Sequence, residues 1–141
     1  MTVSMIPPET IKAYTRAVYC VLSPEPFDLK IGEVSQPLLN LYGSCNCVTS
    51  AFLTAFNPLG ILASDDENVE AQCKLEACLV EKSIVFTNGI GKDKKGLWPG
   101  EKSVLALGMQ IEEAKIIGVS FRQNAIVWIG EDAKPELILL G

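Results

Sequence analysis

The sequence predicts an α+β protein with a ferredoxin-like split βαβ core, β-α-β-β-α-β, that begins at about residue 46. The patterns between residues 46 and 129 follow the order strand, helix, strand, strand, helix, strand. Right-handed crossovers and a hairpin between the middle two strands leave few other ways to bury both helices on one face. With 141 residues, 48% of them apolar, we expect a single domain, 1–141, with residues 1–45 as an N-terminal extension and residues 46–141 as the core plus one C-terminal strand.

The N-terminal extension is expected to hold a helix and a short strand. Pro7 and Pro8 open a run to Tyr19 whose apolar residues fall three and four apart, which is typical of a helix with one packed face. Residues 27–31 alternate between apolar and polar and predict a half-buried strand. Residues 37–43 fit a short helical turn that ends at Gly43. We expect the extension to cover a face or an edge of the sheet.

The core begins with a strand from Cys47 to Phe56, which Asn57-Pro58 ends. Ser64-Asp-Asp-Glu67 is a capping box, and it predicts a helix that runs to about Val80. The elements expected after this helix are a strand at 83–87 closed by Asn88-Gly89, a Gly- and Lys-rich loop, strand 103–107, helix 111–121, strand 125–129 and a final strand at 136–140 that pairs back as a hairpin.

Composition disfavours several classes of partner. The formal net charge of −5 disfavours nucleic acid, because phosphate backbones are bound through clustered Lys and Arg. No apolar stretch has the length of a membrane span, and the N-terminus lacks the pattern of a signal peptide. We therefore expect a soluble, cytoplasmic protein with no nucleic-acid and no membrane partner.

The sequence also predicts neither a metal site nor a cofactor. There is no His, and the five Cys residues include no CxxC pair, so four ligands for a metal such as zinc are not available. Cys45-Asn-Cys47 is at most half of such a site. Cys73 and Cys78 lie within a predicted helix, where Cys most often acts as a small buried apolar residue.

Polar residues gather where the predicted strands and helices meet. If the topology holds, one rim of the sheet carries the end of the first core strand, the start of its helix, and the starts of the third and fourth strands. Binding residues tend to lie on loops that a rigid scaffold holds in place. The candidate ligand-binding residues at this rim are Asn57, Ser64, Asn68, Trp98, Ser103, Gln123 and Asn124, with Glu101 as the candidate catalytic residue.

Each candidate also has a purely structural interpretation. Asn57 before Pro58 is typical of a strand end, and Ser64 is foremost a helix cap. Asn68 fits a solvated position in the first helical turns, Trp98 could cover the end of the core, and Glu101 could cap a backbone or pair with a Lys. Gln123 and Asn124 are the least easily explained this way, because two adjacent amides before a buried strand need hydrogen-bond partners.

Four stretches of the chain resemble the DUF3293 family of small bacterial proteins of unknown function. They are Phe52-Leu-Thr54-Ala55-Phe-Asn57-Pro58, the downstream Ser64 and Asn68, Trp98-Pro-Gly-Glu101-Lys-Ser103, and Phe121-Arg-Gln123-Asn124-Ala125. The resemblance covers roughly residues 47–130. It implies no activity, but it is consistent with the rim acting as one site. The chain departs from the family at Arg122, where the resemblance implies a small residue, often Gly.

Three functions remain open at this point. The first is a module that binds a small molecule such as a nucleotide or nucleoside, with amides, Trp98 and one carboxylate at the rim. The second is a hydrolase- or transferase-like enzyme that uses Glu101 as general base and Asn57, Gln123 or Asn124 as oxyanion donors. The third is a protein-interaction domain, a homo-oligomer included, that uses Trp98 and the exposed edge of the final strand.

Overall fold

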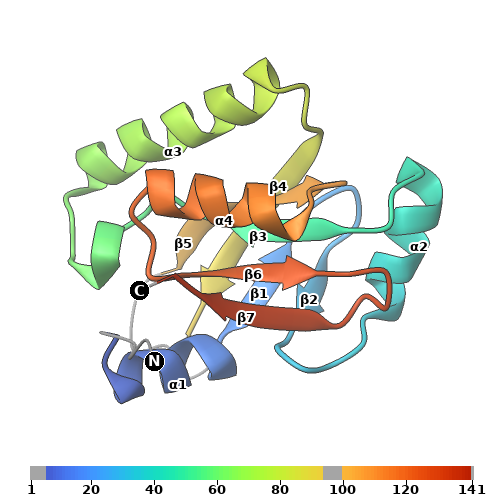
Figure 1. Cartoon of the computed structure of the whole chain (residues 1–141), viewed down its shortest axis with the longest axis horizontal. Coiled ribbons are helices and arrows are strands. Elements are labelled where there is room, and N and C mark those ends of the chain that lie inside the picture. Colours follow the sequence, from blue (N-terminus) through green and yellow to red (C-terminus); the bar gives the residue numbers. More distant parts are fainter. Residues whose placement is uncertain (1–5, 94–99, 141) are drawn as a thin grey trace.

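A computed structural model of the chain describes residues 6–93 and 100–140. The described residues form a mixed α+β structure built on one curled, antiparallel sheet of seven strands in the order β2-β1-β4-β5-β3-β6-β7 (Figure 1). The strands are β1 (Val18–Val21), β2 (Phe27–Leu29), β3 (Ser50–Leu53), β4 (Phe86–Lys92), β5 (Glu101–Leu107), β6 (Ala125–Ile129) and β7 (Pro135–Leu139). The helices are α1 (Pro8–Arg16), α2 (Gln36–Cys45), α3 (Asp65–Glu81) and α4 (Ile111–Ser120), and a short 3-10 turn, η1, spans Pro58–Gly60.

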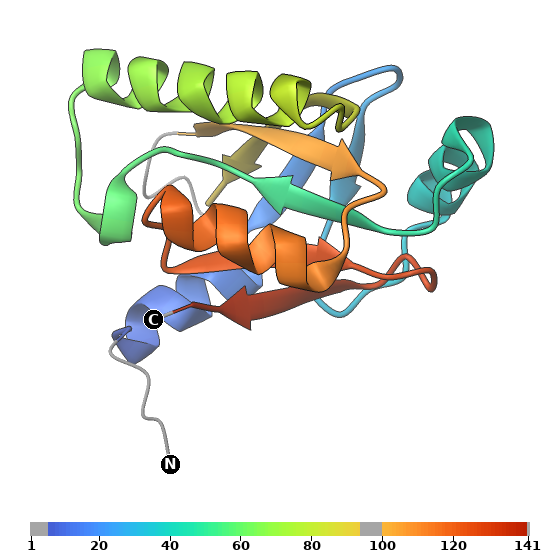
Figure 2. The same ribbon diagram turned by 45° about the horizontal axis from the view of Figure 1, so that its top comes forward.

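Helices α3 and α4 cover one face of the sheet (Figure 2). Strand β3 contributes apolar side chains to both faces of the sheet, because successive side chains on a strand point in opposite directions. Ala51 and Leu53 pack with Leu75 and Leu79 of α3, whereas Phe52 lies in a second apolar cluster on the other face. Helix α3 therefore packs one face on the sheet, but the expectation of buried Cys residues is wrong here, because Cys78 is only half-buried and Cys73 is exposed.

The second face is enclosed by the curl of the sheet and by α2. Tyr42 of α2 bonds Ser50 Oγ at 2.9 Å and donates to Ile129 O at 3.2 Å, which anchors α2 at the end where β3 begins and β6 ends. Gly32 N donates to Pro135 O and Ser35 N to Ala133 O, both at 2.9 Å. These bonds bring the two outer edges of the sheet together at the end that α2 covers. Helix α1 lies at the opposite end of the curled sheet (Figure 1).

The N-terminal extension contributes more strand than the sequence predicted. The first helix ends at Arg16 rather than near Tyr19, and the following residues form β1, which pairs with β4. The sheet therefore extends past β4 through β1 and β2. Helix α2 ends at Cys45 and not at Gly43, and its C-cap, Asn46, has a left-handed conformation (φ 54°). Asn is one of the few residues that adopt this conformation readily, which explains the later end.

The position of β4 is a correction. The sequence predicted a strand at 83–87 closed by Asn88-Gly89, but β4 runs from Phe86 to Lys92 through both residues. A turn pattern was overridden because β1 and β5 bond to β4 on its two sides. Gly89 is required there, since an added Cβ would lie 2.7 Å from the ring of Phe52 and 2.9 Å from Cys20 O.

Candidate functional site

A cavity of about 600 Å³ lies at the end of the sheet where β3 ends and where β5 and β6 begin. Helix α1 and the segment 57–63 form two of its walls, and the inner face of the curled sheet forms its floor. Six of the eight residues proposed from the sequence line it: Asn57, Asn68, Glu101, Ser103, Gln123 and Asn124. The structure thus brings together polar residues from four separate parts of the chain.

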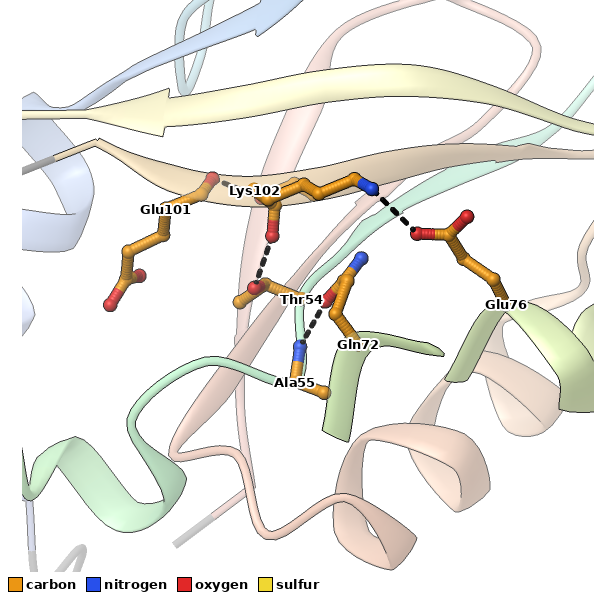
Figure 3. Close-up of polar contacts among 7 residues, drawn as sticks. Thr54, Ala55, Gln72, Glu76, Glu101 and Lys102 are labelled. Carbon is orange, nitrogen blue, oxygen red and sulfur yellow. Dashed lines mark hydrogen bonds and ion pairs between the residues drawn. The ribbon is translucent and has the colours of Figure 1, made fainter. Parts of the chain in front are cut away.

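Glu101 is the first residue of β5, and its side chain enters the cavity. Its neighbour Lys102 points to the other face of the strand, where its Nζ lies 3.5 Å from Glu76 Oε2 of α3 (Figure 3). Strand alternation therefore separates Glu101 from the adjacent cation. Burial raises the pKa of the Glu101 carboxyl, and the hydrogen bond that it accepts from Asn57 partly opposes this increase.

Asn57 links the carboxylate to α3. Its Nδ2 donates to Glu101 Oε2 at 2.8 Å, while its Oδ1 accepts from Ala63 N and from Asn68 Nδ2, both at 3.0 Å. Asn68 Oδ1 in turn accepts from Asn57 N at 2.8 Å. Because a backbone N–H can only donate, the bond from Ala63 fixes which way the Asn57 amide points. Asn68 is buried, 4% exposed, so its interpretation as a solvated helix residue is wrong.

The backbone around Asn57 explains how this side chain reaches the cavity. Asn57 has a φ of 46° and Leu59 a φ of 57°, both in the left-handed region. Leu59 N donates to Arg122 O at 2.6 Å, and Arg122 itself has a φ of 57°. Three residues that are not glycine therefore hold left-handed conformations in two segments that bond to each other, a type of strain often found at functional sites.

Aromatic side chains form the deep side of the cavity. Tyr19 and Phe52 meet edge to face with ring centroids 5.3 Å apart. Tyr19 OH donates to Tyr14 O at 2.5 Å, which ties β1 to α1. Burial raises the pKa of the Tyr19 hydroxyl, and the nearby Tyr14 and Glu101 raise it further, so this hydroxyl stays protonated. Phe56 and Tyr14 complete the aromatic part of the lining.

Gln123 and Asn124 take the partners that two adjacent amides require. Gln123 Nε2 donates to Phe56 O at 3.2 Å and to Phe121 O at 3.3 Å. Asn124 Nδ2 donates to Tyr14 OH at 3.4 Å. These bonds join the start of β6 to the end of β3 and to α1. Gln123 Nε2 already donates to two carbonyls, so it is not a free oxyanion donor. Asn57 Nδ2 uses one of its two N–H groups on Glu101.

The remaining candidates occupy other positions. Ser64 caps α3: its Oγ accepts from Glu67 N at 3.1 Å and Glu67 Oε1 accepts from Ser64 N at 3.2 Å. The predicted capping box is confirmed, and Ser64 is not among the described residues that line the cavity. Ser103 lines the cavity and donates to Glu101 O at 2.9 Å. Trp98 lies outside the described residues.

Two features of the site could not be recognised from single motifs. Tyr14 and Tyr19 come from the N-terminal extension, where the sequence predicted one helix as far as Tyr19, and no pattern indicated that they line a cavity. Gln72 of α3, 1% exposed, accepts from Ala55 N at 2.9 Å and holds the end of β3 (Figure 3). The burial of Gln72 could have been recognised from helical spacing, because Asn68, Gln72, Leu75 and Leu79 lie on the same face of α3.

Groups of three or more His, Cys, Asp or Glu able to hold a metal do not occur among the described residues. The five cysteines are free thiols, and burial raises the pKa of Cys20 to about 11. In the described ranges no helix combines the length and the apolar character that a membrane crossing needs.

The sequence model of one protein family, described as Protein of unknown function (DUF3293), matches residues 53–126. The chain belongs to the DUF3293 family. A search of curated proteins and a search of solved structures each found no match. The resemblance noted in the sequence is therefore confirmed as family membership.

The DUF3293 segment contains the polar half of the cavity. It begins at the last residue of β3 and ends in β6, so it includes Asn57, Asn68, Glu101, Gln123 and Asn124. Helix α1 and strands β1 and β7 lie outside it, and these elements supply Tyr14, Tyr19 and Leu137 to the lining. The aromatic wall of this chain therefore comes partly from beyond the family segment.

Proposed function

We propose that the cavity at the Glu101 end of the sheet binds a small organic molecule and that this binding is the function of the protein. The observation that carries the proposal is the convergence of six polar candidates, predicted from separate strand and helix junctions, on one cavity of about 600 Å³. A volume of this size is typical of small-molecule sites. A mostly apolar lining with a few oriented polar groups is also typical of them.

Three acidic residues, Glu9, Asp65 and Glu101, are in the lining, and no Lys or Arg is found among its described members. This charge pattern favours a nucleoside-like or other neutral or cationic ligand over a nucleotide, because phosphates are usually held by cations or by free backbone N–H groups. The N–H groups of the Gly89-Ile-Gly91 stretch belong to β4, which is paired on both sides, so this stretch is not a phosphate-binding loop.

A thermal-shift screen of nucleosides, amino acids, amines and sugars tests the proposal. A ligand at 100 times its Kd raises the free energy of unfolding by about 2.7 kcal/mol, which is readily detected as a higher Tm. Ala13 of α1 lines the cavity and Lys12 beside it is exposed and does not. Ala13→Trp should abolish the ligand-induced shift, and Lys12→Trp should leave it unchanged. No shift with any compound, or equal shifts in both variants, contradicts the proposal.

Glu101 also supports a second candidate, an enzyme in which this carboxylate is the general base. A carboxyl with a raised pKa inside a cavity is the pattern that acid–base catalysis uses. Once a ligand is known, Glu101→Gln should abolish its turnover while the protein remains folded and still binds it. Turnover that survives in the variant removes Glu101 from any mechanism.

We further propose that β3, α3, β4, β5, α4 and β6 form a ferredoxin-like split βαβ unit. The support is their chain order, the antiparallel sheet order β4-β5-β3-β6 and the placement of α3 and α4 on one face (Figure 2). The cytoplasmic location and the absence of nucleic-acid and membrane partners stay predictions from composition. Self-association through β7, an edge strand of the sheet, also stays a prediction.

A further inference from the structure

Two of the polar atoms left for a ligand in this cavity are acceptors on side chains of fixed orientation, Gln123 Oε1 and Glu101 Oε1. Gln123 shows this most clearly, because its Nε2 donates to two backbone carbonyls, Phe56 O and Phe121 O. A flipped amide would set oxygen against oxygen, so the orientation is fixed. The Gln123 Oε1 atom accepts no hydrogen bond from the described residues, and Gln123 lines the cavity. A ligand that reaches this amide must therefore donate to it.

Glu101 also presents an acceptor oxygen to the cavity, and this one carries a charge. Its Oε2 accepts from Asn57, whose amide orientation is fixed by Ala63 N. Glu101 Oε1 has no partner among the described residues, and Lys102 is directed to Glu76 on the other face of β5 (Figure 3). A partly buried carboxylate with one oxygen unpaired attracts a donor, and a cationic donor most strongly.

The apolar part of the cavity suits the body of such a ligand. Phe52 and Tyr19 meet edge to face on the floor, and Phe56 and Tyr14 lie in the same lining. Aromatic faces attract cations as well as apolar rings, with a strength that increases when water is excluded. The carboxylate and the aromatic residues therefore favour the same class of molecule.

We propose that the ligand of this cavity is an organic cation, an amine or amidine carried on an aromatic or apolar body, whose N–H groups donate to Glu101 Oε1 and Gln123 Oε1. This inference rests on the proposed small-molecule function and names its ligand class. The cationic group displaces water from the carboxylate, and the body packs against the aromatic floor.

Tryptamine, tryptophol and indole-3-acetate test the inference, because they share an indole ring and differ mainly in carrying an ammonium, a hydroxyl or a carboxylate. We expect tryptamine to bind about tenfold or more tightly than tryptophol by calorimetry, since a hydrogen bond to a charged group contributes about 1.5–3 kcal/mol. Glu101→Gln should remove this preference while tryptophol binding is kept. Glu131→Gln, which removes the same charge from the exposed β6–β7 turn, should leave the preference unchanged.

Tryptamine binding should also strengthen as pH rises through the raised pKa of Glu101, whereas tryptophol binding should not strengthen. If tryptophol or indole-3-acetate binds as tightly as tryptamine, or if Glu101→Gln keeps the preference, the cation inference is overturned and the small-molecule function stands. If none of the three binds and the wider screen also finds no ligand, the proposed function fails and the inference fails with it.

Discussion

Glu101 shows how one residue's chemistry depends on its surroundings. On the sequence it is one of 17 acidic residues, and nothing in its neighbourhood marks it as buried. In the structure it enters a cavity with aromatic walls, its adjacent cation points away, and Asn57 supplies one hydrogen bond. Desolvation then outweighs that bond, so the protonated form is favoured relative to a carboxyl in water.

The raised pKa of Glu101 predicts a pH-dependent stability. Between the ordinary value of 4.5 and the raised value, the folded protein binds more protons than the unfolded chain, so the Glu101 contribution to stability decreases as pH rises through this window. Glu101→Gln keeps an acceptor for Asn57 and removes the buried charge. We expect this variant to be more stable than the parent at pH 7, with no such gain below about pH 4.5.

Urea denaturation at pH 4 and pH 7 measures this effect. Glu131→Gln is the matched control, because it removes one carboxylate from an exposed turn. The explanation would be wrong if Glu101→Gln destabilised the protein equally at both pH values.

Arg122 predicts a second effect at the residue scale. It has a φ of 57°, in the left-handed region that a residue with a Cβ adopts at a cost of about 1–2 kcal/mol. The Gly that the family resemblance implies here would adopt this conformation without that cost. Arg122→Gly should raise the free energy of unfolding by about 0.5–1 kcal/mol, after allowance for the extra freedom of Gly in the unfolded chain.

Chemical denaturation of Arg122→Gly and Arg122→Ala separates the relief of backbone strain from the loss of the Arg side chain. Only the Gly variant should gain stability, since Ala keeps the Cβ that causes the strain. A similar gain in both variants would point to the Arg side chain instead of the backbone.

At the scale of single elements, α3 has a clear start in the sequence, the capping box, but this motif says nothing about which face of the helix is buried. The capping box places its N-terminus at Asp65, as the sequence predicts. The stripe that packs on the sheet, however, starts with two polar residues, Asn68 and Gln72, before it becomes apolar. These two amides hold the end of β3 through Asn57 N and Ala55 N, so α3 positions the site as well as covering the core.

Ser64→Ala tests the assignment of Ser64 to the helix end. Loss of the N-cap bond to Glu67 N should lower the free energy of unfolding by about 1 kcal/mol. The Kd for a ligand, measured where the variant is fully folded, should not change, because Ser64 does not appear in the described lining of the cavity. If the Kd weakens in Ser64→Ala but keeps the parent value in Ser64→Gly, which is a tolerated N-cap, fraying of the helix end explains the weaker binding. A Kd weakened in both variants would place the Ser64 hydroxyl in the site.

At the scale of the whole molecule, the two ends of the sheet differ in how firmly they are closed. Helix α2 is anchored by buried residues, Leu38, Leu41 and Tyr42 among them, and it closes one end. Helix α1 has no buried residue within its bounds and is attached to the cavity end through bonds of Tyr14 to Tyr19 and Asn124. The cavity therefore lies behind the less firmly held helix.

Hydrogen exchange tests this difference. Amides of α1 should exchange well before those of β3 and β5, because local opening of α1 exposes little apolar surface. A ligand in the cavity should slow exchange in α1 more than in α2, since α1 forms a wall of the cavity. Equal protection of α1 and β3 in the free protein would show that α1 opens only when the whole protein unfolds.

Local sequence patterns were enough to predict the order of strands and helices in the core, the capping box at Ser64 and a rim where polar residues gather. These follow from local patterns, because periodicity and capping depend on residues a few positions apart. Long-range packing is the reason that Asn88-Gly89 continues a strand, that Asn68 is buried under Asn57, and that Tyr14 and Tyr19 line the cavity. It also decided the protonation chemistry of Glu101. Desolvation and pairing depend on which distant segments pack together, and no local pattern contains that information.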